Sequence, residues 1–252
     1  VDSVSRHIEG VLHSDESVKA LVSIGSTGAV LAGAVMKVGR IKGVKRPAFC
    51  PILPTMNKSI VGVCDSGANV DCEPYYLQQF ALMGTLYMQK CYNIEKPRVA
   101  LLNIGTEEEK GDQLRKETYQ LLKNSSSINF VGNMESRDLL SGNYDLVVCD
   151  GFSGNVLIKS TEGTALELMK LLKKSFTSNL KNKIGALILK KSVYEIKDYM
   201  DYNNYGGGVM LGVKKIIIKG HGSSKTNAIY NCIQQAYTLE KNQICQAIEA
   251  EI

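Results

Sequence analysis

The 252-residue sequence has no tryptophan, only three histidines, and no two cysteines in a C-x-x-C pair. His7, His13 and His221 lie far apart, so we expect no dedicated zinc or iron site. No apolar run approaches the roughly 20 residues that span a bilayer, and no secretory signal opens the sequence. An odd number of scattered cysteines predicts reduced thiols in a cytoplasmic protein. The seven are Cys50, Cys64, Cys72, Cys91, Cys149, Cys232 and Cys245.

The charge is only mildly basic, with a net charge of +5 and a pI near 8.7. Such a balance suits an acidic partner or an anionic substrate. Aromatic residues make up 7% of the chain, too few to support base stacking, so we expect no nucleic-acid partner. Apolar residues at 44% and charged residues at 22% are typical of a globular protein.

Strand-like and helix-like segments alternate along the whole chain. The predicted strands are Lys19–Ile24, Ile60–Cys64, Arg98–Asn103, Ile128–Val131, Asp145–Cys149 and Lys215–Lys219. The predicted helices are Thr27–Val38, Pro74–Cys91, Asp112–Lys123, a long one from about Asn155, and Ser224–Glu249. In the last helix Ile229, Ile233, Ala236, Tyr237 and Ile244 mark the expected buried face. The alternation predicts one α/β unit over 1–252, with three αβα layers around a mainly parallel sheet.

Most of these strands are followed by glycine together with small hydroxyl or amide residues. The turns are Ile24–Gly28, Asp65–Asn69, Asn103–Thr106, Val131–Asn133, Asp150–Asn155 and Gly220–Ser224. Ligands of open α/β sheets bind outside the carboxyl ends of the strands, where glycine and helix N-termini favour anions. Six such turns converging at one sheet edge predict a site for phosphate or carboxylate. They do not name a reaction.

Three common catalytic motifs are absent. No G-x-G-x-x-G follows a strand with an acidic residue at the expected distance, and there is no P-loop lysine. The Gly151–Asn155 turn lacks the spacing of a nucleophile elbow, and no His–Asp pair can be assigned to Ser153. A nicotinamide enzyme and a covalent serine enzyme are therefore disfavoured.

Eight segments together resemble the acyl-carrier-protein–phosphate acyltransferases of bacterial phospholipid synthesis. They match in order and spacing from about Ser17 to the C-terminus. They are Gly39–Gly43, Arg46–Ala48, Leu53–Thr55, Asp65–Asp71, Leu101–Glu107, Asp150–Val156, Asn204–Gly207 and His221–Ser224. Nothing matches the Asp-Ala-Met-Gly-Gly-Asp strand that opens the family. Because the first residue is Val1, we expect the natural start to lie upstream.

The resemblance implies an isocitrate/isopropylmalate dehydrogenase-like (phosphotransacetylase-like) fold, no cofactor, and a homodimer. It also implies fatty acyl transfer from acyl carrier protein to inorganic phosphate, with Lys110 and Asn155 as catalytic residues. The alternatives are a solvated loop lysine beside Glu107–Glu109 for Lys110 and a helix cap for Asn155. The implied phosphate-binding candidates, several of which can equally be caps or structural residues, are Ser26, Thr27, Asn69, Thr106, His221, Ser223 and Ser224.

Two surface features have two interpretations each. Arg40, Lys42, Lys45 and Arg46 form a basic loop that either docks the acidic carrier protein or is a solvated turn. A helical projection is expected over about 175–202, where apolar residues of 180–191 alternate with lysines. This composition suits peripheral contact with the anionic inner face of the membrane, and equally a subunit interface.

Two rival functions remain open. A phosphotransacetylase that uses acyl-CoA would share the fold and differ in its acyl donor. A non-catalytic anion-binding protein would bind phosphate without forming acyl phosphate.

Overall fold

The computed structural model describes residues 17–222 and 224–252, and its nine strands form two sheets. The four-stranded sheet has the order β1-β9-β8-β2, and the five-stranded sheet has the order β3-β4-β7-β5-β6. The strands are β1 Ala20–Ser23, β2 Ala48–Cys50, β3 Ile52–Pro54, β4 Ile60–Cys64, β5 Val99–Asn103, β6 Phe130–Glu135, β7 Leu146–Val148, β8 Gly208–Leu211 and β9 Ile216–Lys219.

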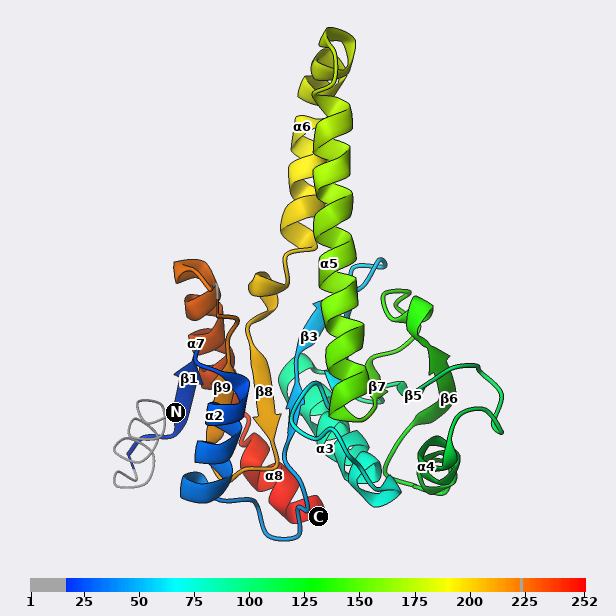
Figure 1. The fold of residues 1–252 in the computed structure, drawn as a ribbon. Coiled ribbons are helices and arrows are strands. Elements are labelled where there is room, and N and C mark those ends of the chain that lie inside the picture. Colours follow the sequence, from blue (N-terminus) through cyan, green and yellow to red (C-terminus); the bar gives the residue numbers. More distant parts are fainter. Residues whose placement is uncertain (1–16, 223) are drawn as a thin grey trace.

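Helices cover both faces of these sheets (Figure 1). They are α2 Thr27–Gly33, which continues as the π-helical turn η2 Ala34–Val38, α3 Pro74–Tyr92, α4 Gln113–Lys123, α5 Gly151–Phe176, α6 Leu180–Tyr199, α7 Thr226–Lys241 and α8 Ile244–Glu251, with short 3₁₀ turns η3 Ser136–Asp138 and η4 Tyr202–Tyr205. The α/β class with three layers is therefore confirmed.

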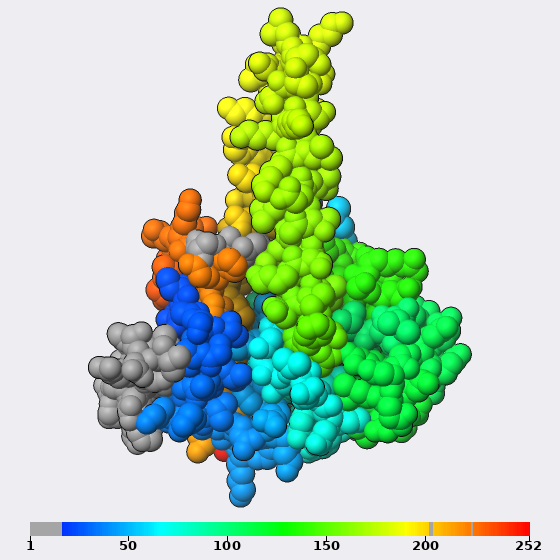
Figure 2. Space-filling model, in the orientation of Figure 1, coloured from blue at the N-terminus to red at the C-terminus, as the bar shows by residue number. Residues whose placement is uncertain are grey.

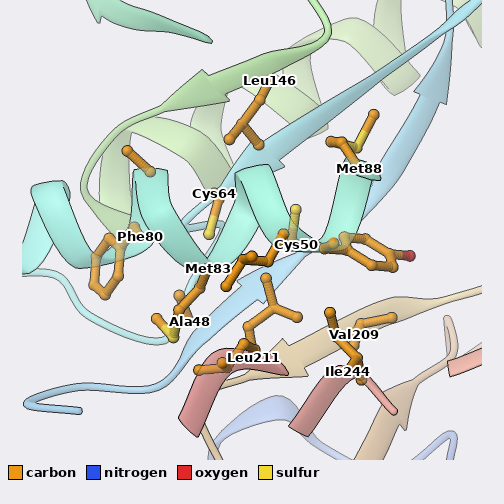
Figure 3. Close-up of a cluster of buried hydrophobic side chains, with 14 of the residues drawn as sticks. Ala48, Cys50, Cys64, Phe80, Met83, Met88, Leu146, Val209, Leu211 and Ile244 are labelled. Atoms are coloured by element: carbon orange, nitrogen blue, oxygen red, sulfur yellow. The ribbon is translucent and has the colours of Figure 1, made fainter. Parts of the chain in front are cut away.

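The strands alternate their side chains between two layers of core, as the period of two requires. In β9, Ile216 and Ile218 join a large cluster with α3, α7 and α8, whereas Ile217 faces α2. The large cluster runs under both sheets: Figure 3 shows Met83 of α3 among side chains that include Leu146 and Leu211, one from each sheet. One shared helix layer therefore holds the two sheets side by side.

The segment Ala48–Pro54 passes from one sheet into the other. Its first half, β2, pairs antiparallel with β8, and its second half, β3, pairs antiparallel with β4. Since β8 is also antiparallel to β9, the strands β1 and β9 run opposite to β4, β7, β5 and β6. The prediction that six glycine turns meet at one edge of a single sheet is therefore wrong. The turns after β1 and β9 lie at the opposite end from the others.

Two predicted helices differ from the structure. The long helix begins at Gly151, because Asp150 rather than Asn155 is its N-cap and accepts a hydrogen bond from the Ser153 backbone N–H. The last predicted helix is two helices, separated where Gln243 adopts φ 51°. Its expected buried face is wrong in part, since Ile233 and Tyr237 are exposed and Cys232 and Leu239 are buried.

The outer part of α5 pairs with α6 to form an arm that stands away from the body (Figures 1 and 2). The arm includes much of α5 and is longer than the expected 175–202. No described residue of α6 is buried, and the Tyr199 hydroxyl at its base donates a hydrogen bond to the Thr55 carbonyl at 2.8 Å. Among the described residues, no helix has both the length and the apolar content to cross a membrane.

Candidate active site

A cleft with a volume of about 290 Å³ lies between α2 and α5, on the face of the sheets that these helices share. Its floor is the crossing segment, represented by Phe49, Pro51 and Leu53. Neither helix covers this junction between the sheets, so the side chains that flank it face an open space. The cleft is where the structure brings functional groups from both halves of the chain together.

One side of the cleft, the α5 wall, consists of Ser66 and of one face of α5. Asn155, Lys159 and Glu162 lie on that face, because residues four and seven positions apart project in the same direction from a helix. The Lys159 ammonium forms an ion pair with the Glu162 carboxylate at 2.8 Å. This wall therefore presents an amide, a hydroxyl and a charged pair to the cleft.

The opposite side, the β9 wall, consists of Thr27, the glycines Gly206–Gly208 and the segment Lys219–Gly222 with His221. Gly206 has φ +89°, and a Cβ there would overlap the Gln235 side chain. The Gly207 N–H donates to Gln235 Oε1 at 2.9 Å, and Gln235 Nε2 donates back to the Gly207 carbonyl at 3.1 Å. One amide side chain thus fixes the bare backbone of this wall from behind.

Gln235 is itself held by two tyrosines. Its Nε2 donates to the Tyr87 hydroxyl at 2.8 Å, and that hydroxyl lies 3.1 Å from the Tyr92 hydroxyl. Burial raises the pKa of Tyr87 well above its usual value, so these groups stay neutral. A second cavity of about 270 Å³ lies behind the glycines and shares Gly206 with the cleft.

The turn after β4 is organised by a buried carboxylate, Asp65. It accepts hydrogen bonds from the backbone N–H groups of Phe49 at 2.8 Å and of Asn69 at 2.6 Å, and from Asn69 Nδ2 at 3.0 Å. Removal from water raises the pKa of Asp65 to about 6, although these donors oppose the rise. The turn places Ser66 in the cleft and Gly67 against the Asn155 side chain.

An ion pair between Arg115 and Asp150 connects the first turns of α4 and α5. Both side chains are largely buried, with 15% and 7% of their surface exposed. Arg115 also donates to Ser153 Oγ at 3.0 Å, and Ser153 Oγ donates to Asp150 at 2.8 Å. Ser153 is thus committed to this network, in agreement with the absence of a nucleophile elbow. The network fixes the start of the helix that carries Asn155.

Three of the predicted site residues, Thr27, Asn155 and His221, line the cleft together. Ser26 is the N-cap of α2 and accepts from the Ala29 N–H, so its place matches the capping alternative. Asn69 is not in the lining. Its Nδ2 donates to the Pro47 carbonyl at 2.8 Å, and its own carbonyl accepts from the Gly151 N–H. Ser224 lies just beyond the lining, and Ser223 is outside the described residues.

Lys110 and Thr106 lie on the loop between β5 and α4 and are exposed. The Lys110 carbonyl accepts a hydrogen bond from Asn103 Nδ2 at 3.1 Å, which ties this loop to the end of β5. Since β5 pairs with β7 in parallel, the loop is at the same sheet edge as the first turn of α5. Neither side chain is part of the cleft lining in this structure.

Sequence reasoning missed four polar lining residues, which are Ser66, Lys159, Glu162 and Lys219. Two of them had a usable signal. Once Asn155 is a candidate, helical spacing puts Lys159 and Glu162 on the same face. Lys219 directly precedes the Gly220–Ser224 turn, and its sequence pattern marks it only as the end of a strand.

The basic loop lies outside the cleft lining and is linked to it through Pro47 and the Asp65 turn. All four of its cations, Arg40, Lys42, Lys45 and Arg46, are exposed. The Arg46 guanidinium lies over the Tyr76 ring, 5.7 Å from its centroid. The next residue, Pro47, accepts the hydrogen bond from Asn69 and so connects this loop to the turn that carries Ser66.

The cleft suits an anion. Two lysines and one glutamate line it, together with a histidine and several backbone groups. Within residues 17–222 and 224–252, no group of three or more His, Cys, Asp and Glu residues is placed to hold a metal ion. The chemistry that this arrangement supports is binding and electrostatic stabilisation of negative charge.

The sequence is similar to proteins of lipid synthesis. The family profile described as fatty acid synthesis protein matches residues 3–247. The phosphate acyltransferase of Thermoanaerobacterium thermosaccharolyticum is 49% identical over 235 residues, which are 93% of this chain and 70% of that protein. The phosphate acyltransferase of Bacillus subtilis is 45% identical over 233 residues, which are 92% of this chain and 70% of that protein.

The fold is similar to that of two solved structures. A phosphotransacetylase from Streptococcus pyogenes superimposes with a TM-score of 0.57 and 17% identity, covering 94% of this chain and 66% of its own. A branched-chain phosphotransacylase from Enterococcus faecalis gives a TM-score of 0.56 and 14% identity, with coverages of 94% and 78%. These likenesses show the fold. From the sequence matches, the chain belongs to the fatty acid synthesis protein family, in which its curated relatives are phosphate acyltransferases.

Proposed function

We propose that this chain transfers a fatty acyl group from acyl carrier protein to inorganic phosphate, giving an acyl phosphate. The observation that carries the proposal is the placement of Asn155 and His221 on opposite walls of one cleft with cationic side chains. The relatives named phosphate acyltransferase support the same reaction class.

The reaction needs little proton transfer at its first step. A phosphate oxygen forms a bond to the thioester carbonyl carbon, and the carbonyl oxygen takes up negative charge. Collapse of this intermediate re-forms the C=O bond, breaks the C–S bond and releases the carrier thiolate, which takes a proton from solvent. The protein must therefore hold a dianion and stabilise an oxyanion. The polar groups of the cleft are suited to both tasks.

In this proposal Asn155 donates its amide N–H groups to the reacting centre. Its place one turn inside α5 leaves the side chain free of capping, since Asp150 caps the helix. Lys110 acts from the neighbouring loop, where its exposed ammonium must swing toward the cleft when substrate is bound. Thr27 and His221 are binding candidates on the other wall.

The direct test incubates the chain with acyl-carrier protein and inorganic phosphate and traps acyl phosphate with hydroxylamine. We expect hydroxamate to form only when all three components are present. No hydroxamate, together with measurable phosphate binding, would instead support the non-catalytic anion-binding alternative. Faster turnover with acyl-CoA than with acyl-carrier protein would support the phosphotransacetylase alternative.

Variants test the two catalytic candidates. Asn155→Ala and Lys110→Ala are each expected to lower turnover by about 100-fold, the usual scale for losing one preorganised donor. Lys116→Ala, an exposed lysine of α4, is the control and should keep full activity. Near-normal acyl phosphate formation by either variant would remove that residue from the mechanism.

We also propose that the carrier protein docks at the basic loop, because this loop adjoins the turn that carries Ser66. Charge complementarity with an acidic protein would accelerate encounter more than it would strengthen the complex. Reversing Arg40 and Lys42 to glutamate should raise the apparent KM for acyl-carrier protein and leave the KM for phosphate unchanged. An unchanged KM for the carrier would reject docking at this loop.

The arm exposes many large apolar side chains, and we propose that a second copy of the chain covers them. They include Leu166, Leu168, Leu171, Leu187 and Ile188, each more than half exposed. They extend along both helices rather than clustering at the tip, which favours packing against another chain over contact with lipid. Light scattering should give a dimer mass. A monomer that co-sediments with anionic vesicles would support the membrane alternative.

A further inference from the structure

Two lysines approach the cleft from opposite walls. Lys159 comes from the third turn of α5, and Lys219 is the last residue of β9. They belong to different layers of the molecule and are 60 positions apart in the sequence, so only the fold brings them together. Neither is among the residues that the family resemblance marks as catalytic.

Their surroundings leave an excess of positive charge. Glu162 pairs with Lys159, and it is the one acidic side chain among the described residues that line the cleft. Lys219 has no carboxylate partner among the described residues, and its Nζ donates to the Gly220 carbonyl. With two lysines and one glutamate, the lining has a net charge of +1 when His221 is neutral.

The Lys159 ammonium acts on Lys219 across the cleft. Partial burial, and then the positive charge of Lys159, lower the pKa of Lys219. Two cations that face one space repel each other unless an anion lies between them. An anion would offset this repulsion and replace the water that the partly buried Lys219 loses. A negatively charged ligand between Lys159 and Lys219 would therefore bind favourably.

The position along α5 indicates what the anion does. Lys159 is four residues from Asn155 and therefore about 5–6 Å further along the same helix face. An anion held between the two lysines would share the cleft with the Asn155 amide, which projects from the same face of α5 as Lys159.

Building on the proposed function, we propose that Lys159 and Lys219 form a clamp for a phosphate group, one lysine from each wall. Two sources have this chemistry, namely the attacking inorganic phosphate and the phosphodiester of the carrier protein's prosthetic arm. The clamp is distinct from the catalytic pair, because its task is to bind and place the phosphate rather than to stabilise the oxyanion.

The experiment compares Lys159→Met and Lys219→Met with the unaltered chain. Methionine keeps most of the length and volume of lysine and removes the charge. Loss of one charge-assisted contact should weaken phosphate binding by about 10- to 100-fold. Titration calorimetry with inorganic phosphate alone measures this directly, without the carrier protein, so it is independent of whether the proposed reaction occurs.

Kinetics separate the two sources. A raised KM for phosphate, with an unchanged KM for acyl-carrier protein, assigns the clamp to inorganic phosphate. The reverse pattern assigns it to the carrier's phosphodiester. Unchanged phosphate titration and unchanged values of both KM in the two variants would overturn the proposal.

Matched controls separate charge from folding. Lys170 forms the same kind of i,i+3 ion pair, with Glu167 at 2.7 Å, on the arm part of α5, so Lys170→Met should leave phosphate binding unchanged. Lys159→Arg and Lys219→Arg keep the charge and should restore affinity to within a few-fold of the unaltered chain. If the arginine variants bind phosphate as poorly as the folded methionine variants, the charge is not the cause and the clamp is rejected.

Discussion

The two walls of the cleft are held in place by opposite means. Behind the α5 wall lie buried charges: the Asp65 carboxylate with its N–H donors, and the Arg115–Asp150 ion pair. Behind the β9 wall lies a neutral network, in which Gln235 and Tyr87 hold bare glycine backbone. The position of the α5 wall therefore depends on the protonation state of the buried carboxylates and on close packing around them. The position of the β9 wall depends on glycines, which have no side chain, and on hydrogen bonds between uncharged groups.

The largest expected effect comes from filling the contact between α5 and the Asp65 turn. A Cβ at Gly154 would overlap the Asp65 carbonyl oxygen and lie 2.8 Å from Cys149 Sγ. Because this neighbour is backbone, α5 must move. Gly154→Ala should destabilise the fold by more than about 3 kcal/mol and displace Asn155. Urea unfolding and acyl phosphate formation measure the two consequences.

Gly163→Ala is the control on the same helix. No atom lies within 4 Å of a Cβ at that position. Alanine is a better helix former than glycine, so this variant should gain up to about 1 kcal/mol. Equal stability losses at Gly154 and Gly163 would show that helix propensity, and not the close approach to Asp65, controls this region.

The next effect concerns pH. The pKa of Asp65 in the folded state is about 6, against a value of 3.8 without burial. The folded state therefore binds the proton more tightly, and the contribution of Asp65 to stability falls as pH rises from about 4 to about 6. The difference corresponds to about 3 kcal/mol. Urea unfolding at several pH values should show this loss in the unaltered chain and not in Asp65→Asn.

Asp71→Asn sharpens this measurement. Asp71 is exposed and close to the same turn, so its replacement should leave the pH profile parallel to that of the unaltered chain. If Asp65→Asn retains the same pH dependence between 4 and 6, the buried carboxylate is not its source, and the contrast between a charged and a neutral wall fails.

The smallest effect is expected behind the β9 wall. Gln235→Leu removes both hydrogen bonds to Gly207 and the one to Tyr87. Unsatisfied groups of this kind cost about 2 kcal/mol. The loss should be independent of pH between 4 and 8, because no charged group takes part. Chemical unfolding across that range is the measurement.

Gln234→Leu is the neighbouring control. Its side chain is exposed and donates to the Tyr230 hydroxyl, so its loss should cost less than about 0.5 kcal/mol. A loss at Gln235 that grows or shrinks with pH would mean that the β9 wall also depends on ionisation.

The sequence predicted the helices with long periodic patterns and the strands with continuous apolar runs, and it missed the strands beside proline or glycine. The α3 and α4 helices and the β4, β5 and β7 strands were placed within a few residues. The strands β2, β3 and β8 were not predicted, because Pro51 separates the first two, Pro54 ends β3, and β8 begins within the glycine run Gly206–Gly208. Without them, two sheets of opposite strand direction cannot be distinguished from one.

The site residues that could be predicted from sequence are those that directly follow a strand. Thr27, Asn155 and His221 follow strands and reach the cleft. Asn69 has the same sequence signature, but its amide is used by Pro47 and Asp65. Lys159 and Lys219 line the same cleft only because of the two-sheet arrangement. Local sequence therefore predicts which residues can reach a ligand, and tertiary structure decides which of them do.

The crossing segment has a consequence for how substrates enter. Ala48–Pro54 contributes one strand to each sheet. Its first half, β2, is hydrogen-bonded to β8, and its second half, β3, is hydrogen-bonded to β4. The turn after β4 is also bonded to the first half, since the Ser66 N–H donates to the Phe49 carbonyl at 3.1 Å and the Phe49 N–H donates to Asp65 at 2.8 Å. A hinge movement between the two sheets at this line would have to break these hydrogen bonds. We therefore expect substrates to be admitted by side-chain and loop movement at the mouth of the cleft rather than by opening between the sheets.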